Sequence, residues 1–131
     1  MPQINAMADD ACKARLAEFL AMVHESMTQF ADCETVDINT RGSTGDTPLT
    51  IAVVNDNVRI VTDLLEAGAD PNISGEDDCT PLHHAASHGH CEIIALLLAY
   101  GASNSVVDRD GYTPADTARI LHYKEAFKML S

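Results

Sequence analysis

The sequence predicts an all-α solenoid of stacked helix-turn-helix units joined by hairpin-like loops, with about three repeats and an N-terminal capping helix. The first observation behind this fold class is that the triplet Thr47–Leu49 recurs 33 residues later as Thr80–Leu82, and again, weakened, as Thr113–Ala115. The second is that other landmarks keep this spacing, since Gly68 falls on Gly101. Self-similarity at a fixed period of this length is typical of repeat architectures, and it argues against an enzyme.

The N-terminal part of the chain precedes the first Thr-Pro pair. Residues 1–8 are expected to form a disordered or extended start, and residues 9–35 a capping helix or helix pair. Asp9 and Asp10 can cap a helix whose apolar residues recur at spacings of three and four, namely Leu16, Phe19, Leu20, Val23, Met27 and Phe30. This helix is predicted to cover the end of the stack; the alternative is a linked helix that serves a separate partner.

The repeats are expected to fill residues 36–131, in units of about 41–73, 74–106 and 107–131. In the middle unit, Thr80 is predicted to be an N-cap whose hydroxyl accepts a hydrogen bond from the backbone N–H near His83. Pro81 suits the first helical position, and Gly89 ends this short helix.

The second helix of the middle unit is predicted over Cys91 to Tyr100, followed by Gly101 as a left-handed C-terminal cap. Its apolar residues lie at helical spacing, at Ile93, Ile94, Leu97 and Leu98. Asp110 and Gly111 then indicate a tight turn before the next Thr-Pro. One such unit cannot bury its apolar face alone, so stacking against a similar neighbour completes the core.

Composition limits the function classes. A net charge of −12, from 20 acids and 8 bases, disfavours direct binding to nucleic acid or an anionic membrane and favours a basic protein partner. The alternative is that the charge merely keeps the surface solvated. No apolar stretch reaches the roughly 18 to 20 residues of a membrane helix, and the start lacks the pattern of a secretion signal. The four scattered cysteines suggest reduced thiols. We therefore expect a cytoplasmic protein that is a monomer when free.

The segment Thr80–His90 resembles the ankyrin repeat, whose signature Thr-Pro-Leu-His-x-Ala-Ala-x-x-Gly-His it matches at every fixed position. The resemblance covers Val36 to Ser131. It implies a helix-pair fold and a protein-binding function, with His83 and His90 in structural roles. The first repeat departs from the pattern at Asn55–Asn57, where the Gly-His turn is replaced. The third carries Asp116 in place of the histidine, and an acid there can form a capping box with the Thr113 backbone.

The sequence also offers residues for a metal site and for a catalytic pair. A cluster of zinc-ligand types suggests a metal centre, formed by Cys79, His83, His84, His88, His90 and Cys91. The structural roles implied by the resemblance are the stronger reading, so no metal or cofactor is expected. For catalysis the tempting pair is Ser87 and His88, but neighbours on an exposed helix face are not expected to form a hydrogen-bonded dyad.

The remaining candidate function is binding of a protein partner. In ankyrin proteins partners dock on the concave surface formed by the hairpin tips and the exposed side of each first helix. Carried over by position, the resemblance implies these partner-binding residues: Ser43, Thr44, Asp46, Val54, Asn55, Glu76, Asp77, Asp78, Cys79, Ser87, His88, Arg109, Asp110, Tyr112, Ile120 and Leu121. Asp78 stands where Gly45 and Gly111 stand in the other units, so the turn there is expected to differ.

The leading hypothesis is a stand-alone module that binds, and inhibits, one basic protein through a concave acidic face, as a toxin-neutralising immunity protein would. The alternative is an adaptor or scaffold subunit of a larger intracellular assembly, in which the helix from Asp10 to Ala31 supplies a second interface.

Overall fold

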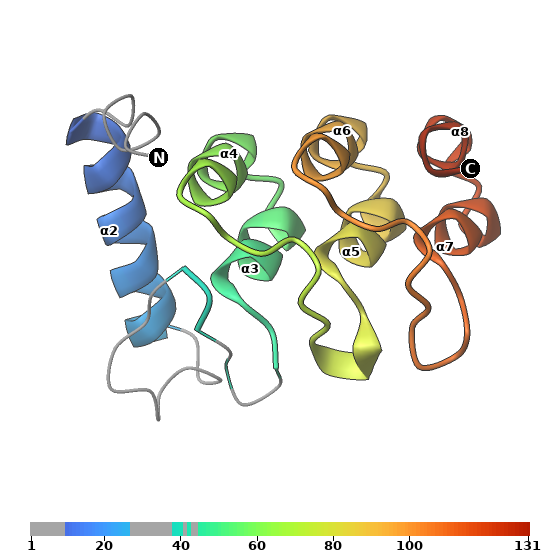
Figure 1. Ribbon diagram of the computed structural model, residues 1–131, viewed down its shortest axis with the longest axis horizontal. Helices are drawn as coiled ribbons and strands as arrows, with labels where there is room; N and C mark the ends of the chain where they lie inside the picture. The colour runs from blue at the N-terminus through green and yellow to red at the C-terminus, as the bar shows by residue number, and fades with distance from the viewer. Residues whose placement is uncertain (1–9, 27–37, 41, 43–44) are drawn as a thin grey trace.

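The computed structural model describes residues 10–26, 38–40, 42 and 45–131 (Figure 1). The described part is all-α, which confirms the predicted fold class. Its helices are α2 (Asp10–Ser26), α3 (Pro48–Val54), α4 (Val58–Glu66), α5 (Pro81–His88), α6 (Cys91–Ala99), α7 (Pro114–Ile120) and α8 (Lys124–Leu130), with a single 3₁₀ turn, η2 (Glu76–Asp78). Figure 1 shows α3, α5 and α7 in one row, α4, α6 and α8 in a second, and α2 beside α4.

The first helix of each repeat begins at a Thr-Pro pair. The Thr80 hydroxyl accepts from the His83 backbone N–H at 3.4 Å, and the Thr113 hydroxyl accepts from the Asp116 N–H at 3.2 Å. Both positions form the reciprocal capping box, so the predicted caps of the second and third repeats are confirmed. Thr47 makes no side-chain cap bond, and Thr50 stands at the histidine position of that repeat.

The core runs through the stack because equivalent positions of successive repeats are buried together. Leu49 and Leu82 are fully buried, as are the second-helix residues Leu64 and Leu97. The first helices contribute small residues at their contact with one another, namely Ala52, Ala85 and Ala118, all at 0 % exposure. Small side chains let the helices of the first row approach closely, and this sets the spacing of the hairpins below them.

The turn between the two helices has the same left-handed backbone in all three repeats. Asp56 has φ 55°, Gly89 has φ 68° and His122 has φ 66°. Only the middle repeat has glycine there, the residue that adopts this region without a steric penalty. A side chain at position 89 would also collide with the Tyr123 ring, which packs against that glycine.

Helix α2 packs against α4. Phe19 is 7 % exposed and Val23 is fully buried. Arg15 forms an ion pair with the buried carboxylate of Asp63, with its Nε 3.0 Å from Oδ2 and its Nη2 3.3 Å from Oδ1. Apolar and ionic contacts thus both hold α2 on the stack. The rest of the 9–35 segment lies outside the described residues.

No helix in the described ranges is both long enough and apolar enough to cross a membrane.

Candidate functional site

The hairpins before α5 and α7, and the described part of the one before α3, project from the same side of the stack (Figure 1). They share one hydrogen-bond pattern, in which a backbone N–H donates to the carbonyl oxygen four residues on. The N···O distances are 2.9, 2.9 and 2.8 Å in the hairpins 42–46, 75–79 and 108–112. We call the described parts of these hairpins, with the exposed sides of α3, α5 and α7, the tip face.

Neighbouring hairpins are joined to one another. Asp46 Oδ1 accepts from the Glu76 backbone N–H at 3.2 Å. Asp77 accepts twice from Arg109, through its carbonyl from the backbone N–H and through Oδ1 from Nη1, both at 2.9 Å. Gly75 permits the first of these links, because a Cβ there would collide with the Asp46 side chain and come within 3.0 Å of its Cα. The tips therefore form one connected surface.

The middle hairpin has a different turn from its neighbours. Gly45 and Gly111 have φ 93° and 86°, whereas Asp78 has φ 60° and Asp77 before it has φ 58°. Consecutive left-handed residues without glycine are uncommon, although Asp tolerates this region better than most. The result is the 3₁₀ turn η2, which agrees with the expectation that this turn differs, and it places three successive acids at the tip.

The acids of the three hairpins act together on Cys79, a half-buried thiol. Burial, followed by the charges of Asp108, Asp77, Asp46 and Asp78, raises the pKa of Cys79 from 9.0 to about 11. These carboxylates come from three different repeats. The raised pKa of Cys79 therefore reflects burial together with the negative charge of acids from all three hairpins. The thiol is protonated at neutral pH.

The reactivity of the Cys79 thiol tests whether its pKa is raised. We expect Cys79 to react with iodoacetamide very slowly at pH 8, because with a pKa of about 11 only about one thiol in a thousand is ionised there. The rate should rise steadily with pH, and Asp108→Asn should increase it at fixed pH. Peptide mass mapping identifies the modified cysteine, and urea-unfolded protein is the control. A rate that levels off near pH 8 in the folded protein would contradict a raised pKa of Cys79.

The predicted helix positions form two rows along the stack, because they repeat at the same spacing. One row is Val54, Ser87 and Ile120, and the other is Asn55, His88 and Leu121. Their apolar members are exposed, at 40 % for Val54, 45 % for Ile120 and 47 % for Leu121, and Tyr112 on the third tip is 42 % exposed. Ser43 and Thr44 lie outside the described residues. The role of the whole set in partner binding stays a prediction.

The expectation that Ser87 and His88 make no hydrogen bond was wrong. Ser87 Oγ lies 3.1 Å from His88 Nδ1. Both atoms also reach the His84 carbonyl, each at 2.9 Å, because a helix brings the carbonyl of residue i beside side chains at i+3 and i+4. A carbonyl oxygen can only accept, so the serine hydroxyl donates to it and Nδ1–H is shared between it and Oγ. The histidine is then a donor toward the serine, the reverse of a base activating a nucleophile.

The remaining histidines have structural surroundings. His83 is buried and lies between Thr80 and the Tyr112 carbonyl, which links the second repeat to the third hairpin. His84 is half-buried, and burial lowers its pKa, which the nearby Asp46 partly opposes. The rings of His88 and His90 stack with centroids 5.3 Å apart. Within the described ranges, no three His, Cys, Asp or Glu side chains are grouped to hold a metal ion.

One residue of the tip face, Asp108, was not among the site residues predicted from the sequence. Asp108 is among the acids that raise the pKa of Cys79, and its Oδ1 accepts from the backbone N–H groups of Asp110 at 2.9 Å and Tyr112 at 3.0 Å. Its position corresponds to Gly42 and Gly75 in the earlier repeats. An acid at a position otherwise held by glycine was the available signal.

Comparison with known proteins agrees with this architecture. A family model described as "Ankyrin repeat" matches residues 44–76, and one described as "Ankyrin repeats (many copies)" matches residues 64–118. The two matches overlap and together span the described helices from α3 to most of α7. A search of curated proteins finds no match to the chain.

Proposed function

The chain belongs to the ankyrin repeat family, and on that premise we propose that its tip face binds a basic protein. Ankyrin repeats are protein-protein interaction modules, so a protein partner follows from membership, and the charge of the partner is the proposed step. The observation that supports this step most directly is the convergence of carboxylates from three hairpins around Cys79. A surface whose acids gather in one place attracts positive charge more strongly than scattered acids do.

The charge balance of the tip face supports the same choice. Its acids are Asp46, Glu76, Asp77, Asp78, Asp108 and Asp110, and its one cation among the described residues is Arg109. That cation is already paired with Asp77. The net negative charge of this face would steer a basic surface toward the tips and fix its orientation during encounter.

Apolar anchors would then hold the partner. Tyr112 stands on the third tip, and Ile120 and Leu121 follow at the end of α7. Exposed aromatic and aliphatic residues surrounded by polar groups are the usual source of binding energy at interfaces. If the basic surface is the partner's own working surface, binding inhibits it, as in toxin neutralisation.

The adaptor reading remains the second candidate. It requires α2 to bind a partner while it stays on the stack, and the side of α2 away from α4 exposes Ala14, Ala17 and Ala21. Small side chains of this kind supply little contact area, so we favour the tip face.

Charge reversal separates the two candidates. We expect Glu76→Lys with Asp110→Lys to reduce capture of the partner and to slow its association by at least about tenfold at low salt. These positions avoid Asp77, which holds Arg109, and Asp78, whose backbone is left-handed. The matched control is Glu18→Lys with Glu92→Lys, which makes the same change of charge on exposed sites of α2 and α6.

The measurement is affinity capture from the native lysate with all three proteins, followed by mass spectrometry and by association rates at increasing ionic strength. A basic protein that is captured by wild type and control but lost from the tip variant would support the proposal. Equal capture by wild type and tip variant, with loss from the control, would assign the interface to the helix side and favour the adaptor.

A further inference from the structure

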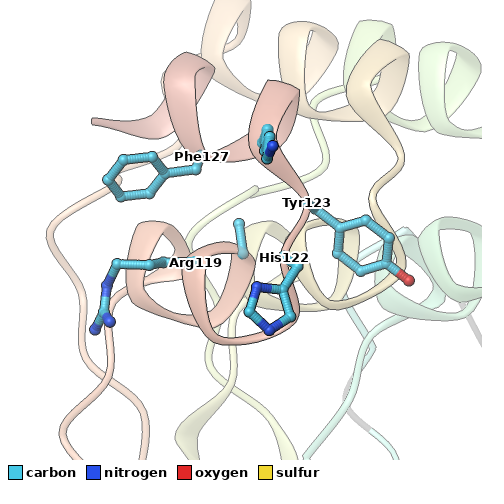
Figure 2. A pocket seen from close by; sticks show the side chains of 6 residues that line it. Arg119, His122, Tyr123 and Phe127 are labelled. Atoms are coloured by element: carbon cyan, nitrogen blue, oxygen red, sulfur yellow. The ribbon is translucent and has the colours of Figure 1, made fainter.

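A small pocket lies at the C-terminal end of the stack, where α7 turns into α8 (Figure 2). Its volume is about 120 Å³, and it is lined by Ala118, Arg119, His122, Tyr123, Lys124 and Phe127. Figure 2 shows Arg119 and Phe127 on one side of the turn, His122 below it and Tyr123 on the other side. The side chains of Arg119 and Lys124 and the aromatic rings of Tyr123 and Phe127 thus border one hollow.

This end of the molecule differs in charge from the rest. Residues 107–131 hold four of the eight bases and four of the 20 acids, so the third repeat is neutral. Residues 1–106 therefore carry the whole net charge of −12. The cations that line the pocket are also available. Arg119 is 58 % exposed and only loosely paired with Asp116 at 3.6 Å, and Lys124 has no ion pair in the described part of the chain.

The need of a terminal repeat for a polar outer face does not by itself explain the residues around the pocket. The last repeat of a stack needs a polar outer face, and Arg119 in place of the fully buried Ala86 meets that need. Tyr123 does not meet that need, because it leaves an aromatic ring 40 % exposed beside the pocket. Arg119 and Lys124 therefore border the pocket together with exposed aromatic surface, which is a mixture that interfaces use.

The size of the pocket limits its occupant. Pockets for drug-sized ligands usually measure about 300 to 1,000 Å³, whereas a cavity of about 150 Å³ takes a single benzene ring. A volume of about 120 Å³ accordingly suits one apolar side chain. We infer that the pocket is a second docking site, which takes one apolar side chain from an acidic peptide segment of a protein partner, with carboxylates of that segment beside Arg119 and Lys124.

The choice of an acidic segment follows from charge complementarity. The groups that border the pocket offer positive charge and hydrogen-bond donors, and an arginine fork suits a carboxylate. This site is opposite in sign to the tip face, and it does not depend on the proposal made for that face. With both sites, the chain would hold two segments of opposite charge at once.

The test uses the full chain and a short fluorescein-labelled peptide with a central phenylalanine between glutamates, followed by fluorescence anisotropy. We expect Lys124→Glu to weaken binding by at least about tenfold. The matched control is Lys128→Glu on the same helix, which makes the same change of charge outside the pocket and should alter binding by less than about twofold. A peptide with serine in place of phenylalanine should bind much more weakly, and one with lysines in place of the glutamates should not bind.

The outcomes are distinct. Loss through Lys124→Glu alone, with an unchanged urea midpoint, supports the docking site. Equal loss through both variants, or no binding of the acidic peptide to the wild type, overturns it. Sedimentation of the free chain as a dimer that Lys124→Glu dissociates would also overturn it, because a second copy would then occupy the pocket. Loss of the basic partner through the tip variant is a separate result that leaves this site untouched.

Discussion

Replacing His83 by alanine is expected to lower the free energy of unfolding by about 3 kcal/mol. The residue is 2 % exposed and uses both ring nitrogens. Nδ1 accepts from the Thr80 backbone N–H at 3.1 Å, so Nε2 carries the proton and donates to the Tyr112 carbonyl at 2.9 Å. Alanine would remove both bonds, leave the buried Thr80 N–H without its acceptor, and open a cavity between two repeats.

Urea unfolding, followed by circular dichroism, measures this loss. His88→Ala is the matched control, because this histidine is exposed and its bonds are local to its own helix; we expect a change within about 0.5 kcal/mol. Similar losses in the two variants would show that His83 does not join the second repeat to the third hairpin.

Replacing Arg15 by alanine is expected to cost about 2 to 3 kcal/mol of unfolding free energy. Asp63 is 5 % exposed, and without Arg15 its buried carboxylate loses the two hydrogen bonds and the ion pair that the guanidinium supplies. Breaking a fully buried pair costs about 3 to 5 kcal/mol. The lower figure applies here because the Arg15 side chain is 33 % exposed and partly screened by water.

A second substitution checks the cause. The position of Asp63 corresponds to Leu96 and Met129 in the later repeats, where an apolar residue is accommodated. Arg15→Ala combined with Asp63→Leu should therefore recover most of the stability lost through Arg15→Ala alone. Thermal and urea unfolding of both single variants, the double variant and the wild type complete the cycle. A double variant no more stable than Arg15→Ala would show that the arginine acts through packing instead of charge.

Much of the fold follows from local sequence signals. Thr80 and Thr113 each precede a proline and cap a helix through contacts three residues away, so the caps and helix starts of these repeats could be predicted. The Arg15–Asp63 pair could not, because it joins residues 48 apart from different parts of the chain. The only sequence signal of this pair is that Asp63 is an acid at a position that is apolar in the other repeats.

In the candidate site, too, some features could be predicted from the sequence and others could not. Repeat spacing identified the rows along α3, α5 and α7, because equivalent residues face the same side. The links between neighbouring tips could not be predicted. Glu76 is bound through its backbone N–H, which carries no sequence signal, and Arg109 is bound through its backbone N–H and its side chain to a residue 32 positions away. The hydrogen bond between Ser87 and His88 was missed for a different reason, because a shared backbone carbonyl brings them together.

The bonds between neighbouring tips, made by Asp46 to Glu76 and by Asp77 to Arg109, also bear on the thermodynamics of recognition. Ordering a flexible loop during association consumes conformational entropy, and this loss subtracts from affinity. Here the described tip residues are bound to one another when the chain folds, so a partner meets them already in place. Binding should accordingly leave the backbone of these residues nearly unchanged, and little of its free energy should be lost to immobilising them.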